Sequence, residues 1–110
     1  MCWTEVFTAG VIDPAEARKV DVALPTIVAS TAPWGVRACH WLPDIEGGPA
    51  VWLTVATDLE KDQLERAAWL ASQVTMMLTR QSVSYDVTRR LRVFVDSLEG
   101  QSRLLAAGED

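Results

Sequence analysis

Two short apolar runs near the middle of the chain give the strongest pattern. Residues 36–42 and 50–56 are rich in β-branched and aromatic side chains, and the segment between them reads Pro-Asp-Ile-Glu-Gly-Gly-Pro. β-branched and aromatic residues favour strands, whereas clustered glycine and proline mark turns. The pattern therefore predicts an antiparallel hairpin.

A helical pattern follows the second run directly. Thr57 and Glu60 have the spacing of a capping box, in which each side chain hydrogen-bonds the other residue's backbone amide. Apolar residues then recur at three- and four-residue steps, at Leu64, Ala67, Ala68, Ala71, Val74 and Leu78. We expect one amphipathic helix that begins at Thr57 and ends near Arg80, whose charge suits a helix C-terminus.

Residues 83–96 fit either a strand or a helix. As a strand, one face is apolar from Val83 to Val95 with Arg89 as the exception, and the other is polar with Phe94 as the exception. The β-branched and aromatic content favours the strand. We then expect a single α+β domain over 1–98, and a C-terminal tail over 99–110 with room for a short helix around 102–107.

The N-terminal third is less regular. Residues 1–8 fit a short strand, and Asp13-Pro14 is typical of a helix start, with aspartate as N-cap and proline in the first turn. We favour a helix that is broken or kinked at Pro25, because proline removes an amide and clashes with the preceding turn. The alternative makes 20–29 an edge strand.

The resulting order is strand, helix, strand, strand, helix, strand. It fits a ferredoxin-like α+β fold, an antiparallel sheet with helices on one face. A sheet covered on one side leaves its other face available, and such faces often pack against a second copy.

Composition narrows the function classes. The chain has 110 residues and a net charge of −5, which disfavours nucleic-acid binding because that affinity depends on Lys and Arg. It has neither an N-terminal signal pattern nor an apolar run long enough to cross a membrane, so we expect a cytoplasmic protein.

Candidate catalytic groups are few. The sequence has none of the common nucleophile, phosphate-binding, zinc or calcium motifs. His40 is the only histidine, and on a strand it points away from its neighbour Cys39, so the two do not form a catalytic pair. We expect a buried or half-buried structural imidazole, with a general base lining a pocket as the weaker alternative. We expect no metal site and no cofactor.

Five tryptophans in so short a chain suggest a surface as well as a core. Trp41 and Trp52 lie on the two hairpin strands, where we expect them to be near neighbours on the face opposite His40. Trp69 and Met76 are seven residues apart on the predicted helix, opposite its apolar stripe. An apolar pair among polar neighbours marks a docking patch, unless another segment of the chain covers it.

Arg89, Arg90 and Arg92 form the main basic concentration. They are candidates for recognising a carboxylate or phosphate. The favoured interpretation is a solvated strand face that nearby acidic residues balance.

The sequence is consistent with two functional hypotheses. The first, which we favour, is a small non-enzymatic protein-binding domain, an accessory, regulatory or inhibitor protein that acts through its Trp/Met surface and forms a homo-oligomer. The alternative is a cofactor-independent enzyme or small-molecule-binding protein built as a dimeric α+β barrel, with an apolar pocket lined by His40, Trp41, Trp52 and Tyr85.

Overall fold

The computed structural model describes residues 12–45 and 47–108, so the strand expected at 1–8 lies outside the described residues. The elements in chain order are α2 (Pro14–Thr31), η1 (Ala32–Trp34), β1 (Ala38–Pro43), β2 (Pro49–Val55), α3 (Asp58–Glu65), α4 (Leu70–Arg80), α5 (Tyr85–Thr88), β3 (Arg92–Ser97) and α6 (Leu98–Gly108). The α+β class is confirmed. The ferredoxin-like order is wrong, because the described chain runs α-β-β-α-α-β-α once its shortest helices are set aside.

The sheet has three strands in the order β1–β2–β3. β1 and β2 form the predicted antiparallel hairpin, but β3 pairs with β2 in parallel. The expectation of an antiparallel sheet is therefore wrong. The chain crosses through α3, α4 and α5 before it returns as β3, and such a crossover brings a strand back in its original direction.

Helix α2 starts where the sequence predicts, because Asp13 accepts a hydrogen bond from the Ala15 amide and Pro14 lies in the first turn. Pro25 lies inside one continuous helix, so a break at this residue and the alternative strand at 20–29 are both wrong. Pro25 is exposed, whereas Val20 and other residues of the opposite side are buried in the core. That packing outweighs the loss of one backbone hydrogen bond.

The capping box at Thr57 and Glu60 is present, but the single helix expected over 57–80 is two helices. Leu64 in α3 and Leu70 in α4 are both buried. Six residues apart on one continuous helix, they would point about 120° away from each other. The turn between α3 and α4 lets both side chains face the sheet.

Both interpretations of 83–96 are partly right. Tyr85–Thr88 is the short helix α5, and the strand begins only at Arg92. The tail is also more ordered than expected, since α6 begins at Leu98 and has 11 residues.

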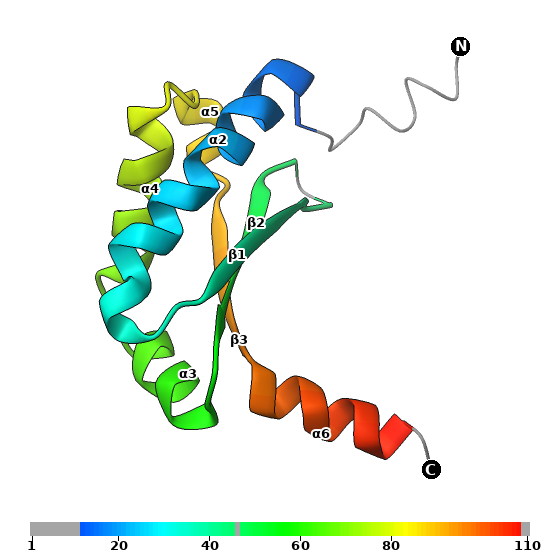
Figure 1. Cartoon of the computed structure of the whole chain (residues 1–110). Helices are drawn as coiled ribbons and strands as arrows, with labels where there is room; N and C mark the ends of the chain where they lie inside the picture. The colour runs from blue at the N-terminus through cyan, green and yellow to red at the C-terminus, as the bar shows by residue number, and fades with distance from the viewer. Residues whose placement is uncertain (1–11, 46, 109–110) are drawn as a thin grey trace.

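Helices α2 and α4 cover one face of the sheet, and the other face has no helix over it among the described residues (Figure 1). Alternate residues of β2 enter the core beneath the helices, namely Val51, Leu53 and Val55. α6 leaves the end of β3 and projects past the second face (Figure 1). We call this second face the uncovered sheet face. None of the helices in the described part of the chain is long and apolar enough to cross a membrane.

Candidate functional site

Three aromatic side chains lie in one row across the uncovered sheet face. The strand register pairs His40 with Trp52 and Trp52 with Phe94. The His40 and Trp52 rings are nearly parallel, with centroids 6.3 Å apart, and the Trp52 and Phe94 rings stack at 4.6 Å. The guanidinium of Arg92 lies 5.4 Å from the centroid of the Phe94 ring. We call His40, Trp52 and Phe94 the aromatic row.

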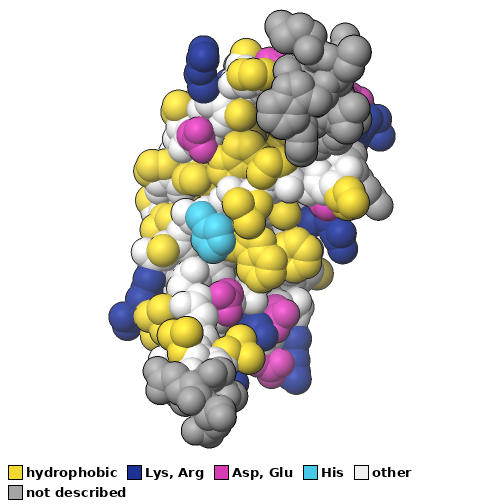
Figure 2. All heavy atoms as spheres, turned by 90° about the vertical axis from the view of Figure 1, so that its right-hand side faces the viewer, with side chains coloured by type: hydrophobic (Ala, Val, Ile, Leu, Met, Phe, Trp, Pro, Cys, Tyr) yellow, Lys and Arg dark blue, Asp and Glu magenta, His cyan; other side chains and the backbone are white. Residues whose placement is uncertain are grey.

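The aromatic row is accessible. His40 is exposed, and Trp52 and Phe94 are half-buried. Figure 2 shows hydrophobic side chains gathered beside the single histidine on this face. The expectation of a buried or half-buried imidazole is wrong, because the helices pack against the odd-numbered side chains of β1 and leave the even-numbered ones open.

Trp41 lies on the other face of the sheet. It pairs with Val51, packs against the core, and donates from Nε1 to Asp21 Oδ1 of α2 at 2.6 Å. The register sets Trp52 opposite His40, so the two hairpin tryptophans are not neighbours on one face as expected. Of the two, only Trp52 belongs to the uncovered sheet face.

Trp69 and Met76 form part of a second apolar surface, on the helical layer. Trp69 precedes α4, and its ring lies 4.6 Å from that of Trp34, which is 52% exposed. Met76 is exposed on the side of α4 away from its buried residues. We call Trp34, Trp69 and Met76 the helical patch. The chain itself therefore covers part of Trp69, through a partner 35 positions away that no local pattern indicates.

The three arginines meet carboxylates of the same chain. Arg89 and Arg90 pair with Asp86 at 2.9 and 3.7 Å, and Arg92 pairs with Asp44 at 3.4 Å. The hydrogen bond from Arg89 is the main reason that the pKa of Asp86 is lowered. Acidic neighbours therefore balance the basic cluster, but the cluster is not the predicted strand face, because Arg89 and Arg90 lie in the turn after α5 and only Arg92 is on a strand.

Cys39 is unsuited to nucleophilic chemistry. Its side chain packs against the core, and burial raises the pKa of the thiol to about 11. The thiolate is the nucleophilic form, so almost none is present near neutral pH. Strand alternation also puts Cys39 and His40 on opposite faces.

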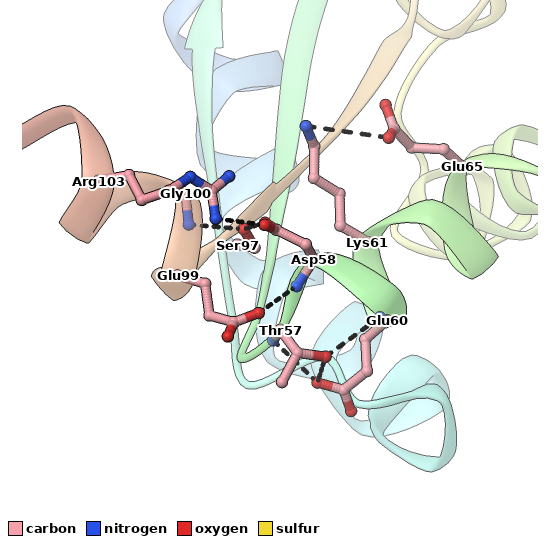
Figure 3. Close-up of polar contacts among 9 residues, drawn as sticks. All are labelled: Thr57, Asp58, Glu60, Lys61, Glu65, Ser97, Glu99, Gly100 and Arg103. Carbon is pink, nitrogen blue, oxygen red and sulfur yellow. Dashed lines mark hydrogen bonds and ion pairs between the residues drawn. The ribbon is translucent and has the colours of Figure 1, made fainter.

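A cluster of polar contacts joins the first turns of α3 and α6 (Figure 3). Ser97 Oγ donates to Asp58 Oδ1 at 2.6 Å and accepts from the Gly100 amide at 2.9 Å. Arg103 pairs with the other carboxylate oxygen of Asp58, and Glu99 Oε1 accepts from the Asp58 amide at 2.7 Å. We call Asp58, Ser97, Glu99 and Arg103 the α3–α6 latch.

The latch does not form a catalytic dyad. The hydrogen bonds from Arg103 and then Ser97 lower the pKa of Asp58, so its carboxylate is a weak base. The only histidine of the chain lies in the aromatic row. Across 12–45 and 47–108, no three His, Cys, Asp or Glu side chains gather as a metal would require.

Comparison with known proteins finds no matching protein family, curated protein or solved structure. The function must therefore be inferred from the geometry of the chain itself.

Proposed function

We propose that this protein is a small non-enzymatic protein-binding domain that holds its partner on the uncovered sheet face. The observation that carries the proposal is the aromatic row, which lies accessible across all three strands with no described helix over it. An accessory, regulatory or inhibitor protein fits a surface of this kind.

The composition of the face favours a protein partner. Aromatic and arginine side chains are enriched at the centres of protein interfaces, and each aromatic ring buries a large apolar area there. Trp52 and Phe94 occupy the centre, and Arg92 and Asp96 lie beyond them on β3. An apolar centre with a charged rim is the usual anatomy of such an interface.

The described residues give less support to the enzyme alternative. The apolar pocket expected from His40, Trp41, Trp52 and Tyr85 is not assembled, because Trp41 lies on the opposite face and Tyr85 is exposed on α5. The pKa of the Cys39 thiol is raised, which makes it a poor nucleophile near neutral pH. The pKa of the Asp58 carboxyl is lowered, which makes its carboxylate a weak base.

The helical patch of Trp34, Trp69 and Met76 is the competing surface for the same function. Trp34 and Trp69 meet at a tilted angle of 49°, whereas the rings of the aromatic row lie nearly parallel across all three strands and offer a partner one continuous surface. We therefore rank the uncovered sheet face first.

Affinity purification from the native host with matched variants tests this choice. The double variant Trp52→Ser/Phe94→Ser should lose the proteins that the wild-type chain retains, whereas Trp69→Ser/Met76→Gln should keep them. Val22→Ser, at an exposed site on α2, serves as the control for a general loss of surface hydrophobicity. Circular dichroism must show that each variant is folded. Retention by the Trp52/Phe94 variant would refute the proposal.

A further inference from the structure

Helix α6 presents an apolar side whose leucines are largely exposed in the described chain. Gln101 Nε2 donates to Asp96 Oδ2 at 2.6 Å, and Asp96 follows Phe94 by two residues on the same face of β3. The Gln101 side of α6 is thus turned towards the uncovered sheet face. Residues three and four positions from Gln101 share its side of the helix. These are exposed leucines at Leu98, Leu104 and Leu105.

The uncovered sheet face and this side of α6 meet at Asp96 and together form an L-shaped surface. Figure 1 shows α6 standing out from the end of β3, on the side of the sheet away from α2 and α4. Leu104 and Leu105 are 74% and 71% exposed on the projecting arm of the L.

We infer that a second copy of this chain occupies the L-shaped surface, in a two-fold symmetric dimer whose sheets face each other with antiparallel strands. The inference rests on the proposed function, since it names the protein that binds the uncovered sheet face. In this dimer the aromatic rows pack against each other, and α6 of each copy covers the hairpin end of the other.

The ends of the surface complement each other. α6 begins at one end of the face, after Ser97, and the hairpin turn lies at the other end, where Leu42 and Ile45 are 57% and 91% exposed. A two-fold axis along the aromatic row exchanges these ends, so the α6 leucines of one copy meet Leu42 and Ile45 of the other. An isologous interface requires such self-complementarity.

The charges on β3 follow the same symmetry. Arg92 lies at the hairpin end of the uncovered sheet face and Asp96 at the α6 end, with Phe94 between them. The two-fold operation brings Arg92 of each copy opposite Asp96 of the other. Charge pairs at an interface rim set orientation and specificity more than affinity.

The uncovered sheet face alone is smaller than the area that a stable dimer interface buries, so α6 must contribute to the interface. Three strands about 4.8 Å apart and six residues of about 3.3 Å cover roughly 300 Å² of flat surface, whereas a standard interface buries about 800 Å² on each partner. The sheet face alone is too small for a stable dimer. The α6 arm and the hairpin end supply much of the difference.

Sedimentation velocity of the full chain over a range of micromolar concentrations tests the inference. The wild type should sediment as a dimer, and Leu104→Glu/Leu105→Glu should sediment as a folded monomer. Leu59→Glu, at an exposed site on α3, should remain dimeric. Arg92→Asp should weaken the dimer at least tenfold in Kd, and Arg92→Asp/Asp96→Arg should restore it.

A wild-type monomer at every concentration would overturn the inference, as would a dimer that survives the α6 substitutions or a double reversal that restores nothing. The proposed function fails separately. If the wild type is monomeric and Trp52→Ser/Phe94→Ser still loses the co-purified proteins, the uncovered sheet face binds a different protein and only the dimer is refuted.

Discussion

The carboxylate of Glu99 accepts a hydrogen bond from the backbone amide of Asp58 at 2.7 Å, so the first turn of α6 caps the first turn of α3. Ser97 adds two hydrogen bonds at the same junction, because its hydroxyl donates to the Asp58 carboxylate and accepts from the Gly100 amide (Figure 3). Amides in the first turn of a helix have no intrahelical acceptor, and side chains of this kind satisfy them. Hydrogen bonds and one ion pair thus set the direction in which α6 leaves the sheet.

Substitution of Ser97 should loosen α6. Ser97→Ala removes the acceptor of the Gly100 amide and one donor to Asp58, and loss of a serine N-cap costs about 1 kcal/mol. We expect urea unfolding to show a loss of this size and trypsin to cleave faster at Arg103. Ser102→Ala, at an exposed site on the same helix, is the control. An unchanged cleavage rate in Ser97→Ala would show that other contacts hold α6.

The latch should also make stability depend on pH in the acid range. The folded chain holds the pKa of Asp58 below its usual value of about 3.9, so the unfolded chain binds more protons there. The contribution of Asp58 is complete above that value and is lost as the pH falls through its lowered folded pKa.

The variant Asp58→Asn should therefore show a smaller fall in the urea midpoint than the wild type as the pH is lowered below about 4. Asp86 has a pKa lowered by Arg89 and contributes in the same direction, so Asp86→Asn serves as the parallel measurement. If both variants keep the wild-type slope, neither carboxylate is the source of the acid sensitivity.

Gly48 should tolerate no side chain. A Cβ at this position would lie 2.2 Å from the carbonyl oxygen of Arg90, a backbone atom that moves only with its chain segment. Overpacking of this kind costs about 1–3 kcal/mol. We expect Gly48→Ala to lower the free energy of unfolding, measured by urea titration, by at least about 1 kcal/mol. A midpoint equal to that of the wild type would mean that the hairpin turn can move away from Arg90.

The thiol of Cys39 should be nearly inert in the folded protein. In a Cys2→Ser background it is the only thiol, and its pKa of about 11 leaves little thiolate near pH 8. We expect slow reaction with a disulfide reagent until urea unfolds the chain, and a steep rise in rate towards pH 11. Rapid labelling of the folded protein at pH 8 would contradict the burial of Cys39.

Local patterns predicted the local structure well. The hairpin and the capping box at Thr57 and Glu60 follow from residues a few positions apart, so the sequence contains nearly all of their causes. The continuity of α2 through Pro25 and the break between Leu64 and Leu70 do not follow from local residues, because packing against the sheet decides them. No pattern within a short window reports that packing.

For the candidate site too, the sequence indicates single residues but not the long-range contacts between them. Trp52 was a candidate, but its neighbours depend on the register with His40 and on the return of Phe94 after a long crossover. One signal was present, since Phe94 is the apolar exception on the otherwise polar face of its strand. Such an exception indicates an accessible apolar residue, yet only the parallel pairing shows that it completes the aromatic row.

The mixed sheet also has a consequence for the order of folding. Pro43 pairs with Pro49 only six residues away, whereas Ala50 pairs with Arg92, 42 residues further along the chain. Hairpins form within microseconds, and pairing over long loops is slower because closing the loop costs entropy. We expect β3 to join last, and α6 with it. Until then β2 exposes an unpaired edge between apolar residues, and slow closure at that edge favours aggregation over folding.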